Sequence, residues 1–153
     1  MADFFDFSGV DTVMTRTNAI QKILSRNDTG ETGGHQAGIH IHKKKEILSF
    51  FPVLNKEEKN PRIMITFTDS FEDKWSFSFI YYNNLFFNGT RNEYRLTGMT
   101  SFIKTHKLKA GDELSLARDE NGFYAIYFSR KNVVQNISAG KLKLGNSWKV
   151  IGI

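Results

Sequence analysis

The sequence predicts a mostly β domain with one or two short helices, and three observations support this prediction. Phenylalanine occurs 14 times in 153 residues, and large rings are enriched in strands and in the cores of barrels and sandwiches. Several short segments alternate between apolar and polar residues, as half-buried strands do. Turn signals such as Asn-Gly separate these segments. Because no repeat or linker interrupts the pattern, we expect a single barrel-like domain over residues 1–153.

The strongest strand predictions come from two hairpins. Residues 62–68 (RIMITFT) and 74–82 (KWSFSFIYY) flank the turn DSFED, and the second segment alternates aromatic with small polar residues. Residues 109–130 (KAGDELSLARDENGFYAIYFSR) predict the other hairpin, with Asn121-Gly122 at the turn.

Shorter segments fill the rest of the domain. Residues 38–42 (GIHIH) predict a strand with His40 and His42 on its outer face, and residues 43–52 (KKKEILSFFP) predict a helix that Pro52 ends. Periodicity leaves helix and strand both open for residues 19–24 and 101–108. A short polar strand is expected after the Asn88-Gly89 turn, and a last apolar strand is expected at residues 148–153.

Composition excludes several classes of protein. There is no cysteine, so the chain forms no disulfide and no thiolate metal site, which favours an intracellular protein. No apolar run approaches the roughly 18 residues that a membrane-spanning helix needs. Residues 1–11 (MADFFDFSGVD) carry three acids and no base, unlike a secretory signal. We therefore expect a cytoplasmic protein with no membrane partner.

The charge is positive and unevenly distributed. The formal net charge is +5 and the pI is about 9.4. Residues 1–15 contain three acids and no base, so 13 acidic side chains face 21 basic ones in the remaining chain. Such a field attracts polyanions, including nucleic acid.

The glycine-rich stretch at residues 25–41 (SRNDTGETGGHQAGIHI) does not fit a nucleotide-binding loop. No Lys follows its glycines at the spacing of a P-loop, and the pattern G-x-G-x-x-G is absent. Gly33-Gly34 still permits a tight bend at positive φ and a close approach of backbone N–H groups to phosphate.

No motif for catalysis or metal binding is convincing. His40 and His42 could share a metal, but no third ligand lies nearby in the sequence. We therefore expect no catalytic residue, no metal and no cofactor in this chain. One alternative is a small Mg²⁺-dependent nuclease that uses Asp69, Glu72 and Lys74. Another is a carbohydrate- or protein-binding β module in which Tyr81, Tyr82 and Tyr94 form a stacking platform.

The segment at residues 88–98 (NGTRNEYRLTG) is unusually polar for a strand. Alternation places Arg91, Glu93 and Arg95 on one face, with Asn92, Tyr94 and Leu96 on the other. Arginine can donate two hydrogen bonds to guanine O6 and N7, and glutamate can accept one from cytosine N4. The alternative is a ladder of surface salt bridges.

Five motifs in order resemble the N-terminal effector domain of the EcoRII restriction endonuclease family. They are NDTGETGGHQAGI, FFP, NP, IYYN and TRNEYR, and they lie within residues 19–98. That family has a run N-D-T-G-x-T-G-G-H-Q-x-G and a run T-R-N-E-x-R. Three positions depart from the family pattern, since Gly89 and Tyr94 stand where basic residues are expected and His40 where an aromatic residue is expected.

The resemblance implies a DNA-binding pseudobarrel of seven or eight strands, like that of the plant B-three transcription factors. Two segments, the N-arm (residues 26–40) and the C-arm (residues 88–96), would bind the major groove and recognise a site similar to CC(A/T)GG. Double-stranded DNA is then the partner, and the domain is an effector without catalytic residues. The nuclease domain, with any Mg²⁺, would lie in the same or a neighbouring chain of a prokaryotic defence system.

The same resemblance implies DNA contacts from both arms, and lysines near them are expected to contact phosphates. The N-arm residues are Arg26, Asn27, Asp28, Thr29, Thr32, His35, Gln36 and His40, of which Asn27, Asp28, Thr29 and Thr32 would shape the arm or touch DNA. The C-arm contacts are Thr90, Arg91, Asn92, Glu93, Tyr94 and Arg95. The phosphate contacts are Lys22, Lys43, Lys44 and Lys45.

Overall fold

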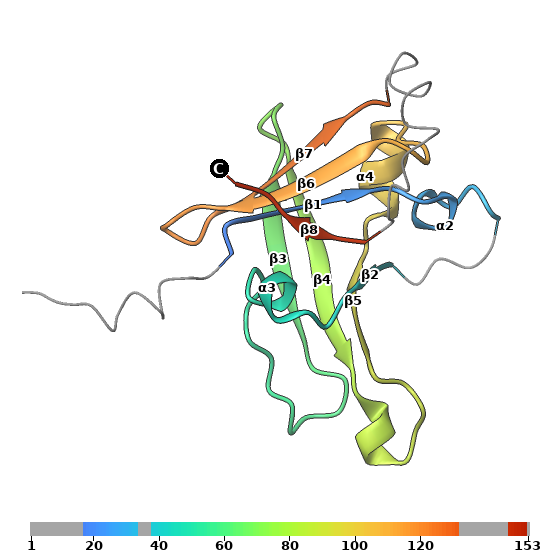
Figure 1. Cartoon of the computed structure of the whole chain (residues 1–153), viewed down its shortest axis with the longest axis vertical. Coiled ribbons are helices and arrows are strands. Elements are labelled where there is room, and N and C mark those ends of the chain that lie inside the picture. The colour runs from blue at the N-terminus through green and yellow to red at the C-terminus, as the bar shows by residue number, and fades with distance from the viewer. Residues whose placement is uncertain (1–16, 34–37, 132–146, 153) are drawn as a thin grey trace, which may run out of the picture.

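The computed structural model describes residues 17–33, 38–131 and 147–152 (Figure 1). The strands are β1 (Ala19–Ile23), β2 (Ile39–Ile41), β3 (Arg62–Thr68), β4 (Lys74–Tyr82), β5 (Glu93–Thr97), β6 (Glu113–Arg118), β7 (Tyr124–Ser129) and β8 (Lys149–Val150). The helices are α2 (Arg26–Thr29), α3 (Lys45–Leu48), α4 (Thr100–Thr105) and the 3-10 helix η1 (Asn84–Phe87).

The described strands form one eight-stranded sheet in the order β2-β5-β4-β3-β7-β6-β1-β8. All neighbours are antiparallel except β3 and β7, which pair in parallel through Phe67 with Tyr124 and Thr68 with Ala125. At this short junction the strand direction changes, so that β3 and β4 cross β6 and β7 at a steep angle (Figure 1). The expected mostly β fold, an open pseudobarrel with short helices, is confirmed.

The two ends of the sheet are joined by a side chain instead of by strand pairing. The indole N–H of Trp148, just before β8, donates to the carbonyl oxygen of His40 in β2 at 3.0 Å. Trp148 is itself buried in the core. The residue before β8 thus joins the two terminal strands of the curled sheet through this hydrogen bond and through apolar packing.

Aromatic rings from several elements stack within the core. The ring of Phe51 stacks on Phe79 with centroids 4.3 Å apart, and Tyr81 stacks on Tyr94 at 4.2 Å. A contact of 5.6 Å between Phe79 and Tyr94 joins the two pairs into a column of four rings. Phe77 is buried on the same face of β4, so the aromatic alternation predicted for this strand is confirmed.

Several elements of the structure are resolved in type, or are shorter, compared with what the sequence predicts. The ambiguous residues 19–24 form β1, and residues 101–108 contribute most of α4. The helix expected at residues 43–52 is reduced to α3, which has no side-chain cap and begins with lysines that its positive N-terminal dipole disfavours. The last strand is only the two residues of β8. None of the described helices is long and apolar enough to cross a membrane.

Candidate functional site

The two polar segments singled out in the sequence meet at one edge of the sheet. Strand β2, which ends the N-arm, pairs antiparallel with β5, which ends the C-arm. The pairs are Ile39 with Leu96, His40 with Arg95, and Ile41 with Tyr94. Ile39, Ile41, Tyr94 and Leu96 are buried, so His40 and Arg95 lie together on the outer face. The predicted separation of Arg95 from Tyr94 and Leu96 is confirmed.

Glu93 lies at the centre of a row of three charged side chains. Arg91 Nε donates to Glu93 Oε2 at 3.0 Å, and Arg91 Nη2 also pairs with this oxygen. Arg95 Nη2 donates to Glu93 Oε1 at 3.3 Å. Burial alone raises the pKa of Glu93, but the hydrogen bonds and charges of the two arginines outweigh it and lower the pKa. The row therefore holds an ionised carboxylate and one net positive charge.

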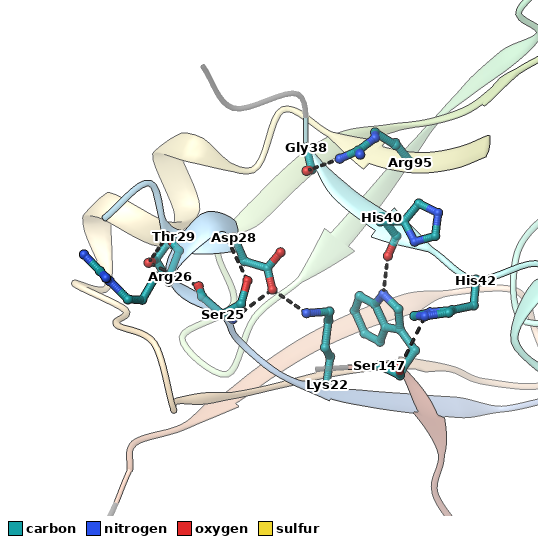
Figure 2. Close-up of polar contacts among 11 residues, drawn as sticks. Lys22, Ser25, Arg26, Asp28, Thr29, Gly38, His40, His42, Arg95 and Ser147 are labelled. Atoms are coloured by element: carbon teal, nitrogen blue, oxygen red, sulfur yellow. Dashed lines mark hydrogen bonds and ion pairs between the residues drawn. The ribbon is translucent and has the colours of Figure 1, made fainter. Parts of the chain in front are cut away.

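Arg95 connects the two arms directly. Its Nη1 donates to the carbonyl oxygen of Gly38 at 3.0 Å (Figure 2). Gly38 has φ +91°, and a Cβ there would lie 2.6 Å from the carbonyl oxygen of Leu96. Only glycine permits this close approach of β2 and β5. Because the side chain of Arg95 is only 21% exposed, most of its surface faces protein.

Arg91 is the more accessible arginine of the row. Its side chain is 38% exposed, and its guanidinium carbon lies 3.7 Å from the centroid of the Tyr82 ring. The backbone N–H of Arg91 donates to Asn84 Oδ1 at 2.7 Å, and its carbonyl oxygen accepts from Leu85 N at 2.9 Å. Both the backbone and the side chain of Arg91 are thus held in place while part of the guanidinium faces solvent.

The N-arm begins with a capped helix of one turn. Asp28 N–H donates to Ser25 Oγ at 3.1 Å, and Ser25 N–H donates to Asp28 Oδ2 at 3.0 Å, which completes a capping box. Lys22 Nζ on β1 also pairs with Asp28 Oδ2 (Figure 2). Lys22 is 5% exposed and Asp28 is 6% exposed. The phosphate contact expected from Lys22 is therefore corrected, because its ammonium is buried against Asp28. Asp28, which is expected to shape the arm or to touch DNA, fixes α2 on β1.

Four other predicted site residues of the N-arm are more accessible. Arg26, Asn27 and Thr32 are exposed, and Thr29 is half-buried. Thr29 Oγ1 donates to Glu31 Oε2 at 2.6 Å, and the same oxygen accepts from Ala110 N–H at 2.6 Å. This contact holds the N-arm against the loop before β6. His35 and Gln36, predicted as DNA contacts, lie outside the described residues.

His40 of β2 and His42, one residue after β2, form a pair on the outer face. The ring centroids of His40 and His42 are 5.2 Å apart, and His42 Nε2 lies 3.2 Å from Ser147 Oγ (Figure 2). Burial lowers the pKa of both rings, and the positive charges of Arg95 and Lys44 lower it further. Within residues 17–33, 38–131 and 147–152, no three His, Cys, Asp or Glu side chains lie close enough to hold a metal ion.

The remaining predicted contacts divide between surface and core. Thr90 is exposed, as are the three lysines that follow His42, namely Lys43, Lys44 and Lys45. Asn92 is half-buried, and its Oδ1 accepts from Tyr81 Oη at 2.7 Å. Tyr94 is only 7% exposed and stacks in the core column. The DNA contact expected from Tyr94 is corrected for that reason, and the platform of Tyr81, Tyr82 and Tyr94 does not form.

The nuclease alternative needs Asp69 as an open carboxylate, but the oxygens of this side chain accept hydrogen bonds within a hairpin. Asp69 is 5% exposed, and its Oδ1 accepts from the N–H groups of Phe71 and Asp73 at 2.8 and 2.9 Å. Its Oδ2 accepts from Trp75 Nε1 at 2.9 Å. These contacts lower the pKa of Asp69 although burial alone raises it. Asp69 thus organises the hairpin between β3 and β4 and offers no open carboxylate beside Glu72.

Comparison with known proteins identifies the family of this chain. A sequence profile of the family described as "Restriction endonuclease EcoRII, N-terminal" matches residues 14–122, more than half of the chain. The chain belongs to this family. Over 107 residues it is 38% identical to the type II restriction enzyme EcoRII of Escherichia coli, a match that covers 66% of this chain and 26% of that enzyme. This member of the EcoRII N-terminal family therefore spans about a quarter of the length of its curated relative.

Solved structures share the fold of this family member. The B3 domain of the UbaLAI restriction endonuclease, solved with cognate DNA, has a TM-score of 0.55 and 18% identity, over 91% of this chain and 89% of that one. The Arabidopsis FUS3–DNA complex has a TM-score of 0.53 and 24% identity, over 73% and 96% of the two chains. The Arabidopsis thaliana transcription factor LEC2–DNA complex has a TM-score of 0.54 and 21% identity, over 76% of this chain and 98% of that one. The fold is therefore a B3-like pseudobarrel.

Two residues that contact Arg91 in this EcoRII N-terminal domain were not singled out as site residues. The sequence predicts no role for Asn84, and it predicts a role for Tyr82 only as part of a stacking platform. The register pairs Tyr82 with Glu93 across β4 and β5, and this pairing could have been inferred once the two strands were aligned. The contact of Asn84 with Arg91 depends on the fold of η1 and carries no signal in the sequence.

Proposed function

We propose that this chain is the sequence-specific, double-stranded DNA-binding effector domain of a type II restriction endonuclease. The observation that carries the proposal is the β2–β5 edge, where both arms end and where Arg91, Glu93, Arg95 and His40 share one outer face. Membership in the EcoRII N-terminal family supports it, and so does the likeness to B3 domains that were solved with DNA.

The N-arm and the C-arm would enter the major groove from two sides. Arg91 would donate to guanine and Glu93 would accept from cytosine, which suits a site rich in G·C pairs such as CC(A/T)GG. Arg95 would add a base contact near the end of the C-arm, while His35 and Gln36 would contact DNA from the N-arm. Arg26 and the exposed lysines 43–45 would bind phosphates and set the register of the domain on the duplex.

Cleavage would belong to another part of the enzyme. Since the chain covers 26% of EcoRII, the nuclease domain would lie in the same or in a neighbouring chain and would hold any Mg²⁺. This domain would then bind a copy of the recognition site and thereby control cleavage. The enzyme would work in the cytoplasm of a prokaryote.

Selection of bound sites from a random duplex pool tests the proposal. We expect enrichment of one short G·C-rich sequence similar to CC(A/T)GG, with a dissociation constant in the nanomolar range at low salt. Affinity should fall steeply with added salt because several phosphate contacts release counterions. Recovery of a pool without any enriched sequence would contradict specific recognition.

Incubation of the pure chain with plasmid and Mg²⁺ tests the competing nuclease hypothesis. We expect intact plasmid, because both carboxylate oxygens of the buried Asp69 accept hydrogen bonds from its own hairpin. Cleavage that persists in an Asp69→Asn variant would place an active site elsewhere in the chain, and cleavage that this variant abolishes would establish Asp69 as catalytic. Either result would overturn the assignment as a binding domain.

A further inference from the structure

We propose that Tyr82 and Asn84 are positioning residues that preset Arg91 for base recognition before DNA arrives. This inference rests on the proposed function, and it extends the site from the C-arm to the end of β4 and the start of η1.

The first observation is the position of Tyr82 on the sheet. Tyr82 pairs with Glu93 in the register of β4 and β5, so their side chains lie on the same face. The guanidinium carbon of Arg91 lies 3.7 Å from the centroid of the Tyr82 ring. At this distance the quadrupole of the ring attracts the cation. Arg91 is thus held by the ring of Tyr82 and by the carboxylate of Glu93.

The second observation concerns the backbone on which Arg91 is mounted. Asn84 Oδ1 accepts from Arg91 N–H at 2.7 Å, and the carbonyl oxygen of Asn84 accepts from Gly89 N–H at 2.6 Å. A Cβ at Gly89 would lie 2.6 Å from Cγ of Asn84. Asn84 therefore fixes the loop at both ends of the stretch from Gly89 to Arg91, and Gly89 allows this contact.

The base of this loop is also fixed. Asn83 is 1% exposed, and its Oδ1 accepts from Asn60 N–H at 2.7 Å. Its Nδ2 donates to the carbonyl oxygens of Lys56 and Glu58 at 3.2 and 2.8 Å. The start of η1 is therefore anchored to the loop before β3. Because these hydrogen bonds fix Asn83 and Asn84 fixes the backbone of Arg91, the position of Arg91 relative to the sheet is fixed as well.

The consequence for recognition is entropic. A flexible arginine on a surface loses rotamer freedom when it donates two hydrogen bonds to a guanine. The ring of Tyr82 and the carboxylate of Glu93 remove part of that freedom in the unbound protein, so less is lost on binding. Tyr82 itself need not touch DNA for this effect. Its removal should lower the affinity for the recognition site more than the affinity for other sequences.

A double-mutant cycle tests the inference with Tyr82→Leu, Tyr82→Phe and Arg91→Ala. The phenylalanine variant keeps the ring face and should bind the selected site within about twofold of wild type, whereas leucine should weaken binding about three- to tenfold. In the Arg91→Ala background, Tyr82→Leu should have no further effect. Asn84→Ala should weaken binding of the selected site in the same way, because it releases the backbone of Arg91. Tyr127→Leu, on the exposed surface of β7, is the matched control for Tyr82→Leu.

A measurement on the protein alone guards against loss of fold. Protons of the Arg91 side chain above the Tyr82 ring should show upfield-shifted resonances, retained in Tyr82→Phe and lost in Tyr82→Leu. Resonances at their usual positions in wild type would overturn the inference. Equal losses from Tyr82→Leu in both backgrounds would also overturn it while leaving the proposed function intact. A wild-type chain that selects no sequence would overturn the proposed function, and base recognition by Arg91 with it.

Discussion

Each arm of the molecule has an acidic side chain in an ion pair, but the two ion pairs differ greatly in solvent exposure. In the N-arm, Asp28 is 6% exposed and pairs with Lys22 of β1, which is 5% exposed, so that the pair joins a helix to a strand. In the C-arm, Arg91 and Glu93 are 38% and 25% exposed and lie on the outer face of the sheet. Removing one partner of a buried ion pair leaves an uncompensated charge in the interior, whereas a partly exposed ion pair can exchange partners. The same chemistry therefore fixes one arm and leaves the charged side chains of the other partly exposed.

Removal of one buried partner should have the largest effect. Asp28→Ala leaves the Lys22 ammonium buried and also removes the capping box of α2, which should lower the free energy of unfolding by about 3–5 kcal/mol. Denaturant unfolding measures this change. Glu93→Ala should cost no more than about 1 kcal/mol, because the C-arm pair is partly solvated. Similar losses from the two variants would abolish the contrast between the arms.

Crowding at the junction of the arms should have the next largest effect. Gly38→Ala adds a Cβ 2.6 Å from the carbonyl oxygen of Leu96 at φ +91°, and we expect a loss of about 2–4 kcal/mol. Gly33→Ala is the matched control, since φ is +77° there but nothing lies within 4 Å of the added atom. That variant should lose only about 1 kcal/mol. The difference between their thermal midpoints isolates the contact of β2 with β5.

Truncation of the accessible arginine should affect binding more than folding. Arg91→Ala should cost about 1–3 kcal/mol in binding of the selected site and relax selection at one G·C pair. Its effect on the free energy of unfolding should stay below about 1 kcal/mol. Arg62→Ala on exposed β3 controls for the loss of one positive charge. An equal loss on every duplex would make Arg91 a phosphate contact and would remove its role in base recognition.

Acidification should give the smallest effect. The arginines lower the pKa of Glu93 in the folded protein, so its contribution to stability is complete above the ordinary pKa of a glutamate. It is lost as the pH falls through the lowered value. Glu93→Gln removes this titration and should unfold with a shallower pH dependence between about pH 5 and 2. Parallel pH profiles of the two proteins would show that the row contributes nothing to stability.

The sequence predicts the sheet well where alternation is long. Residues 62–68, 74–82 and the hairpin around Asn121-Gly122 form strands as expected, because each has a full apolar face that must be buried. Helix α2 was not predicted, although Ser25-x-x-Asp28 is a capping signal. Helix α3 is shorter than its apolar residues indicate, since Phe50 and Phe51 are buried beyond its end.

Part of the arrangement at the β2–β5 edge follows from the sequence, and the rest depends on the fold. Alternation places Tyr94 on the core face, and this outweighs its position within the TRNEYR motif. Lys22 lies in the mostly apolar segment AIQKIL and Asp28 in a polar one, and only the fold reveals that they pair in the interior. Tyr82 and Asn84 act on Arg91 from elements that precede it by several residues. Contacts of this kind depend on strand register and loop geometry, which a motif does not encode.

The hydrogen bond from Trp148 to His40 has a consequence for self-association. Strand β2 lies at the end of the described sheet, and an exposed strand edge is a template for pairing with another chain. The indole occupies a backbone carbonyl of that edge, and Ser147 contacts the side chain of His42 beside it. The C-terminal residues thus block edge-to-edge pairing between copies without adding a further strand next to β2.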